Sequence, residues 1–181
     1  MAISFSRVGV TIAMHTTVSS SPGRTDGWWP TLRSLLVFGV ATGLVAYLGS
    51  LATRSSVESA WFEDLDKPGF YPPSFLFGLV WTILYVMIAV AGWLAWRNGG
   101  RARTTVPWII QLILNLGWTL LFFGAQEPLW ALISIVVLLG VTIWTAAVMW
   151  PHSRVATYLF VPYILWVGFA TVLNGTIVAL N

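Results

Sequence analysis

The sequence predicts an all-α integral membrane protein, built as a bundle of five transmembrane helices. Of its 181 residues, 57% are hydrophobic and only 8% are charged, whereas soluble domains carry about 25% charged residues. A water-soluble core of this size cannot hide so much apolar surface. The charges are also segregated, and they leave five uncharged stretches near the ~20 residues that a helix needs to cross a bilayer: 34–53, 68–96, 104–126, 128–153 and 155–181.

Proline and glycine positions place the helices within these stretches. Prolines lie near four helix starts, where a missing N–H group is harmless, and the glycine pair in "NGGR" is a helix-stop signal. Pro162 lies inside the last helix, which we expect it to kink. We expect an N-terminal extension over residues 1–30, polar and disordered, and a membrane domain over 31–181. Its helices are predicted at about 31–52, 73–97, 105–124, 128–150 and 154–179.

Lysine and arginine are unevenly distributed between the two ends of the predicted helices, and this bias sets the orientation of membrane proteins. Arg54 and Lys67 fall in the connection between the first two helices. We expect a multi-pass protein with its N-terminus in the cytoplasm and its C-terminus outside. No basic face or motif points to nucleic acid. The other seven basic residues all fall on the predicted inner side: Arg7, Arg24, Arg33, Arg97, Arg101, Arg103 and Arg154.

Several classes of chemistry lack the residues that they need. The chain has no cysteine, so thiol catalysis and thiolate metal sites are excluded. Both histidines and all carboxylates lie outside the predicted spans. A proton relay or a carboxylate–histidine metal centre within the membrane is therefore not expected, and neither is a bound metal or other cofactor.

The connection over residues 53–72 is the one long connection, and such connections are usually functional or disordered. Four aromatic residues in it argue against disorder: Trp61, Phe62, Phe70 and Tyr71. We expect this connection to fold back over the outer end of the bundle.

The chain has 12 tryptophans, and most lie near helix ends, as in an interfacial aromatic belt. Three lie deeper, roughly 9–12 Å or more below the outer helix ends at ~1.5 Å rise per residue: Trp81, Trp118 and Trp166. Three helices are thus expected to place an indole at a similar depth beneath the long connection. The predicted belt residues are Trp28, Trp29, Trp93, Trp96, Trp108, Trp130 and Trp150.

Polar side chains accompany these indoles. Asn115 lies one helical turn from Trp118, and Gln111 lies one turn further along the same face. Tyr163 and Asn174 come from the last helix. Buried amides in a membrane face the bundle interior. Two interpretations stay open: interhelical hydrogen bonds of about 0.6 kcal/mol each, or a ligand pocket with aromatic walls, a few polar groups and a lid.

Three segments together resemble the TspO/MBR family of tryptophan-rich sensory proteins and translocator proteins: "WFEDLDKPGFYPPSFLFGLVWTILY", "QLILNLGWTLLFF" and "FVPYILWVGFATVLN". The resemblance covers about 31–181 in the family's order. It implies a ligand pocket that is covered by the long connection. It also implies that the protein forms a homodimer. Family members bind porphyrins such as protoporphyrin IX and heme, and drugs of the benzodiazepine type. The resemblance implies pocket residues Trp61, Phe62, Trp81, Tyr85, Gln111, Asn115, Trp118, Thr119, Trp166 and Ala170.

The resemblance implies a membrane sensor or regulator that binds tetrapyrrole, with porphyrin as ligand rather than cofactor. Some bacterial members promote light-dependent oxidative porphyrin breakdown, which makes Trp81 and Trp166 candidate redox partners. The alternative function is transport of porphyrin, sterol or another amphipathic molecule. The segment "ATVLNGTIVALN" lacks the tyrosine and basic residue of the proposed cholesterol motif, so sterol binding lacks support. Gly39 and Gly43 form a GxxxG pair that suits either a homodimer or packing within the bundle.

Overall fold

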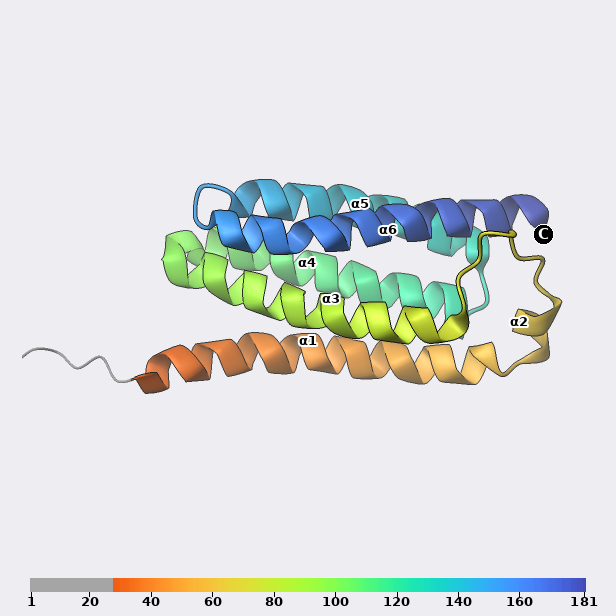
Figure 1. Ribbon diagram of the computed structural model, residues 1–181, viewed down its shortest axis with the longest axis horizontal. Helices are drawn as coiled ribbons and strands as arrows, with labels where there is room; N and C mark the ends of the chain where they lie inside the picture. Colours follow the sequence, from red (N-terminus) through yellow and green to blue (C-terminus); the bar gives the residue numbers. More distant parts are fainter. Residues whose placement is uncertain (1–27) are drawn as a thin grey trace, which may run out of the picture.

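The computed structural model describes residues 28–181, and all regular secondary structure in this part of the chain is helical (Figure 1). Residues 1–27, most of the predicted extension, lie outside it. The long helices run along a common axis, as expected for an all-α membrane bundle. The elements are α1 (Trp28–Val57), α2 (Ala60–Asp64), α3 (Ser74–Ala95), the π-helical turn η1 (Trp96–Gly100), α4 (Arg101–Thr119), the π-helical turn η2 (Leu120–Gly124), α5 (Pro128–Met149) and α6 (Arg154–Leu180).

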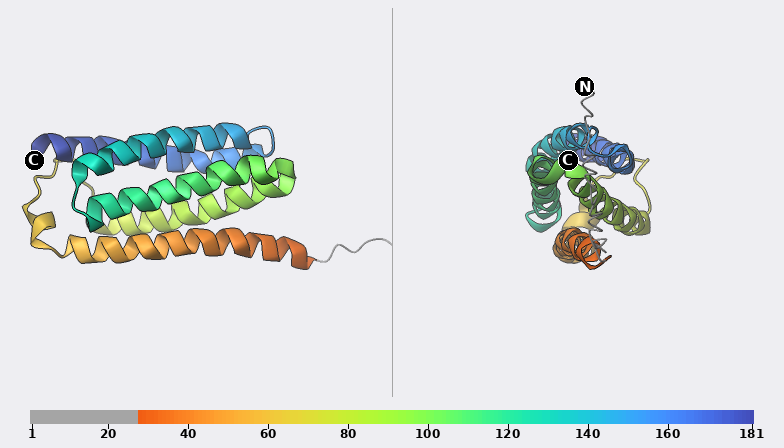
Figure 2. Two further views of the ribbon diagram at one scale, coloured as in Figure 1. Left: turned by 180° about the vertical axis from the view of Figure 1, so that it is seen from behind. Right: turned by 90° about the vertical axis from the view of Figure 1, so that its left-hand side faces the viewer.

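Four segments of the described chain are long and apolar enough to cross a membrane: Thr31–Val57, Ser74–Gly124, Pro128–Met149 and Arg154–Leu180. The protein is therefore an integral multi-pass membrane protein. The second segment has 51 residues and contains both α3 and α4. Non-helical backbone at Asn98 and Gly99 interrupts it, and Gly99 has a φ of 92°, which glycine adopts without strain. Beyond this point the chain reverses, so that α3 and α4 lie side by side (Figures 1 and 2).

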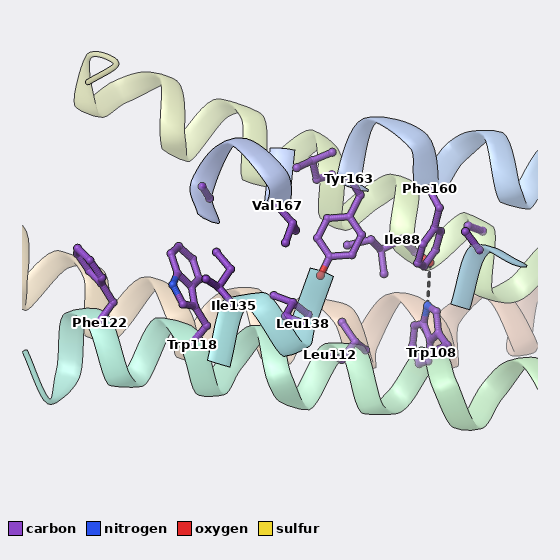
Figure 3. Packing of buried hydrophobic residues seen from close by; sticks show 14 of the residues in the cluster. Ile88, Trp108, Leu112, Trp118, Phe122, Ile135, Leu138, Phe160, Tyr163 and Val167 are labelled. Atoms are coloured by element: carbon purple, nitrogen blue, oxygen red, sulfur yellow. Dashed lines mark hydrogen bonds between the residues drawn. The ribbon is translucent and has the colours of Figure 1, made fainter. Parts of the chain in front are cut away.

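The bundle buries its core between the helices and exposes apolar residues around its outside. α6 packs against α3 and α5, while α1 packs on α3 and α4 (Figure 2). Ile88, Leu138, Phe160 and Val167 have 0% exposure at the centre (Figure 3). Leucine, isoleucine and valine side chains cover much of the exterior. Such a surface suits a protein whose surrounding solvent is lipid.

Two predicted boundaries were wrong, both because charged residues were assigned to connections. α1 continues to Val57 with Arg54 in its last turn, where a cation interacts favourably with the helix dipole. α4 begins at Arg101 instead of residue 105, so Pro107 lies inside this helix rather than at its start. α6 continues through Pro162 as one helix.

Trp108 corrects the predicted interfacial belt. Its side chain is only 3% exposed, and its Nε1–H donates to the Ile88 carbonyl oxygen at 2.9 Å (dashed line in Figure 3). Its ring meets that of Phe38 edge-on at a centroid distance of 4.7 Å. Because α4 starts earlier than predicted, Trp108 lies about two turns from the helix start, and its indole is buried between helices.

Residues 58–73, which we call the cap, connect α1 to α3 at the end of the bundle where α6 also ends (Figure 1). The cap contains the short helix α2, which begins after Ser59. The Ser59 hydroxyl accepts from the Phe62 N–H at 3.4 Å. The long connection is therefore ordered and lies at the bundle end, as its aromatic composition predicted.

Candidate ligand site under the cap

A chain of hydrogen bonds between α3, α4 and α6 forms the inner part of the candidate site. The Tyr85 hydroxyl donates to Asn115 Oδ1 at 2.7 Å. Asn115 Nδ2 donates to the Tyr163 hydroxyl at 3.2 Å, and that hydroxyl donates to Gln111 Oε1 at 2.9 Å. Asn115, Tyr163 and Gln111 are all at most 1% exposed. The predicted interhelical hydrogen bonds are thus present, and they include Tyr163.

One donor in this series of hydrogen bonds, on Gln111, has no acceptor among the described residues. Gln111 Nε2 is buried and meets no acceptor. A buried donor that lacks a hydrogen bond costs about 1–3 kcal/mol. This N–H group is therefore suited to donate to a carbonyl or carboxylate oxygen of a ligand, or to a buried water.

Aromatic rings form the outer part of the candidate site. The Trp81 ring lies 6.0 Å from that of Trp118 at an interplanar angle of 34°. One turn beyond Trp118, in η2, Phe122 lies 6.2 Å from it, and Trp61 of the cap meets Phe122 edge-on at 6.0 Å. Trp118 and Phe122 point into the bundle from the same face of the α4–η2 segment (Figure 3). Together these rings form a continuous apolar wall from α3 through α4 and η2 to the cap.

A side-chain amide holds Trp118 in place. The Trp118 Nε1–H donates to Asn174 Oδ1 at 3.2 Å, and Asn174 Nδ2 donates to the Pro128 carbonyl oxygen at 2.9 Å. Both the indole and the amide are buried. The amide therefore links the indole of α4 to α6 and to the first residue of α5.

The cap presses its own rings against this wall. Phe62 is 7% exposed and lies 6.2 Å from Phe123 and 6.4 Å from Tyr71. The Lys67 ammonium lies over the Phe62 ring and donates to the Phe62 and Leu65 carbonyl oxygens. Burial raises the pKa of the Tyr71 phenol above its ordinary value. The cap thus packs aromatic side chains against the end of the ring wall, and its lysine bonds to carbonyl oxygens of the cap itself.

Trp166 belongs to a neighbouring group of rings. It lies 5.7 Å from Phe77 and 5.4 Å from Phe169, whereas Trp81 contacts Tyr85, Trp118 and Tyr163. Trp166 Nε1 is buried without an acceptor among the described residues. Within the described residues Trp166 therefore has no direct ring contact with Trp81 or Trp118. It is joined to the wall only through Phe77, Tyr71 and Phe62. The Trp166 indole also lines an open groove of about 360 Å³ between α3 and α6, together with Val80, Ile83, Leu84, Met87, Pro162 and Leu165.

The last two predicted site residues take part in helix packing. Thr119 is 7% exposed and donates to the Asn115 carbonyl oxygen at 3.0 Å. Its methyl group faces Gly49 of α1. Ala170 of α6 is 4% exposed and belongs to the hydrophobic core. Both residues thus lie within the bundle, and both contribute to it through close contacts between helices.

Sequence reasoning missed three phenylalanines. Phe122 and Phe123 follow Trp118 by about one helical turn, and Phe77 precedes Trp81 by one. Residues four apart share a helix face, so this spacing was an available signal for Phe122 and for Phe77. Phe123, five residues after Trp118, carries no such signal. Because the prediction concentrated on tryptophan, it left out the rings that join the indoles to the cap.

The sequence matches the family model of the TspO/MBR family over residues 35–180. It is 40% identical over 139 residues to the tryptophan-rich protein TspO of Archaeoglobus fulgidus, an alignment that covers 76% of this chain and 90% of the relative. It is 33% identical over 149 residues to the tryptophan-rich sensory protein of Cereibacter sphaeroides, with 81% and 90% covered. Identity to the translocator protein of Homo sapiens is 32% over 142 residues, with 76% and 83% covered. The chain therefore belongs to the TspO/MBR family.

Proposed function

We propose that this protein is a membrane sensor or regulator that binds a tetrapyrrole such as protoporphyrin IX or heme under the cap. The observation that supports this most is the continuous wall of rings from Trp81 through Trp118 and Phe122 to Trp61. Flat aromatic surfaces stack favourably on a planar macrocycle. The unpartnered Gln111 Nε2 supplies a polar contact at the inner side of this wall.

The proposed ligand contacts are the ten residues that the family resemblance implies. Binding by stacking requires the rings to separate, because Phe62 and Trp118 are buried against their neighbours. Lys67 is one of the two cations near the cap, and its ammonium bonds to backbone carbonyl oxygens. It would meet a porphyrin carboxylate only after it leaves them. The second cation, Arg54 at the end of α1, is exposed.

We also propose that the chain crosses the membrane five times, because the segment Ser74–Gly124 contains two helices that each cross it. α3 has 22 residues, about 33 Å at 1.5 Å rise per residue, which is enough to cross the ~30 Å hydrocarbon core. α4 with η2 has a similar length, so each is taken as a separate crossing. Arg97, Arg101 and Arg154 belong to the two turns at the end opposite the cap, and the positive-inside rule then places that end in the cytoplasm and the C-terminus outside.

If the protein is also an enzyme, its reaction is the light-dependent oxidative breakdown of the bound porphyrin. Trp81 or Trp166 would donate one electron to a photoexcited porphyrin, which would pass it to dioxygen as superoxide. The tryptophan radical would regain its electron from the porphyrin ring, and the oxidised ring would combine with the superoxide, so that the net reaction adds one dioxygen to one porphyrin. Trp81 is the better placed donor, since it contacts Trp118 within the wall. Trp166 lies outside the wall, beside the open groove. We therefore expect Trp81→Phe to slow photobleaching more than Trp166→Phe does.

Titration of the purified protein with protoporphyrin IX tests the proposal. We expect the porphyrin to quench tryptophan fluorescence in the dark, and Trp118→Leu to weaken binding by about tenfold or more, as loss of a stacked aromatic contact does. Trp130→Leu is the matched control, because Trp130 is 59% exposed. Absence of quenching by protoporphyrin IX and by heme would refute tetrapyrrole binding.

Transport of porphyrin or another amphipathic molecule is the second candidate function. The apolar groove between α3 and α6 favours it, because this groove is open to the exterior of the bundle beside Trp166. Saturable porphyrin flux into proteoliposomes would support transport. Binding without flux, with or without photobleaching, would leave the sensor or the photooxidative function.

We also propose a homodimer through α1. A Cβ atom added to Gly39 or Gly43 would meet no heavy atom within 4 Å, so neither glycine is needed for packing within the bundle, the alternative interpretation of this pair. Both glycines are exposed on one helix, where close approach of a second helix is sterically free. Replacing both by leucine should reduce the dimer fraction in cross-linking, whereas Gly140→Leu, also in open space, should not.

A further inference from the structure

The residue that follows α6 clasps the backbone of the cap. Asn181 Oδ1 accepts from the Asp66 N–H at 3.0 Å, and Asn181 Nδ2 donates to the Asp66 carbonyl oxygen at 3.2 Å. Nδ2 also donates to the Ile177 carbonyl oxygen at 2.9 Å, which ties the side chain to its own helix. The oxygen and the nitrogen of this amide are therefore both bonded to backbone groups of ordered segments.

Few hydrogen bonds hold the cap to the rest of the bundle. The Leu76 N–H donates to the Pro73 carbonyl oxygen where the chain enters α3. Otherwise, within residues 28–181, the two bonds to Asp66 are the only ones between the cap and the chain from α3 onward. The remaining contact is apolar, through buried side chains such as Phe62 and Leu65. Apolar contacts are non-directional, so among the described residues the clasp is the one directional contact between the cap and α6.

The clasp lies beside an open groove of about 380 Å³ between the cap, α5 and α6. Trp61 also contacts Phe122 at the outer end of the ring wall. Movement of the cap away from Asn181 would therefore join this groove to the candidate ligand site. The groove is lined by Trp61, Asp64, Leu65, Pro128, Leu129, Val178 and Asn181.

We propose that Asn181 is a positioning residue that latches the cap, and that breaking its two bonds to Asp66 limits how fast a ligand enters and leaves the site. The inference rests on the proposed ligand site. A ligand that enters beneath the cap must displace it, because the rings there are packed against one another. The latch acts on the cap in both the free and the occupied protein, so it sets rates rather than affinity.

Stopped-flow quenching of the full chain by protoporphyrin IX in the dark tests the latch. Asn181→Ala should raise the association and dissociation rate constants together by up to about tenfold, which corresponds to the loss of one or two solvent-exposed hydrogen bonds. The Kd should change by less than about threefold. Leu180→Ala is the control, because Leu180 is 49% exposed and takes no part in the clasp. Unchanged rate constants for Asn181→Ala would overturn the proposal.

Hydrogen exchange of the cap amides separates this proposal from tetrapyrrole binding. Without any ligand, Asn181→Ala should speed exchange at the Asp66 N–H and its neighbours, and Asn181→Asp, which keeps only the acceptor, should have a smaller effect. Faster exchange in a protein that binds no porphyrin would support the latch and refute the proposed function. Exchange in Asn181→Ala equal to that of the unaltered protein would refute the latch, whether or not porphyrin binds.

Discussion

Trp108 and Trp118 lie on the same helix, and both are nearly buried, with 3% and 7% exposure. Their partners differ. Trp108 donates to a backbone carbonyl oxygen of α3 and packs on Gly92 and Phe38. Trp118 donates to the side chain of Asn174 and packs on Trp81 and Phe122, whose neighbours reach the cap.

The contrast separates a structural indole from a candidate binding surface. A backbone acceptor and a glycine cannot move aside without shifting a helix, so the Trp108 contact joins α4 rigidly to α3. A side-chain acceptor and neighbouring rings can rearrange through rotamer changes. Tryptophan content therefore says little about function until the partners of each indole are known.

The largest expected effect is that of Trp108→Ala. Removing this ring opens a cavity against Phe38 and leaves the Ile88 carbonyl oxygen without its indole donor. We expect a loss of about 3–5 kcal/mol in the free energy of unfolding, as for other buried tryptophans. Unfolding by sodium dodecyl sulfate in mixed micelles, followed by circular dichroism, measures it. Trp130→Ala, at an exposed position, should change stability little, and an equal loss for both variants would contradict the distinction.

Gly92→Ala tests the other side of the same contact. A Cβ at this position would lie 2.5 Å from Trp108 Nε1 and 2.9 Å from a ring carbon of Phe38. Such overpacking costs about 1–3 kcal/mol, even though alanine has the higher helix propensity. Gly140→Ala is the matched control, because nothing lies within 4 Å of that position. In the same unfolding measurement Gly92→Ala should lower the free energy of unfolding, whereas Gly140→Ala should leave it unchanged or raise it.

Asn174→Ala tests whether Trp118 depends on its side-chain acceptor. The change leaves the Trp118 N–H and the Pro128 carbonyl oxygen without their amide partner, at a cost of about 1–2 kcal/mol. We expect a shift in tryptophan emission and weaker protoporphyrin quenching. Thr171→Ala removes only a hydroxyl that bonds within α6 and should leave both signals unchanged. If porphyrin affinity is unaltered in Asn174→Ala, the orientation of Trp118 does not matter for binding.

The sequence predicted the helices well because runs without charge are long and sharply bounded. It misplaced the start of α4 and the end of α1 because Arg101 and Arg54 extend these helices instead of ending them. For the site, helical spacing correctly put Gln111 and Asn115 on one buried face. The separation of Trp166 from Trp81 was not predictable, since it depends on how α3 and α6 are rotated against each other. Residue counting gives depth along a helix, but not this rotation.

The smallest expected effect is that of Tyr85→Phe, at the inner edge of the candidate site. The substitution removes the hydroxyl that donates to Asn115 Oδ1 at 2.7 Å but keeps the ring beside Trp81. Asn115 still donates to Tyr163, so the free energy of unfolding should fall by only about 0.6 kcal/mol, the average for a hydrogen bond between membrane helices. Tyr158→Phe is the control, since Tyr158 is exposed on α6. A loss in Tyr85→Phe as large as that of Gly92→Ala would mean that the polar chain holds the bundle together as firmly as Trp108 does. The contrast between the rigid Trp108 contact and the adaptable surroundings of Trp118 would then fail.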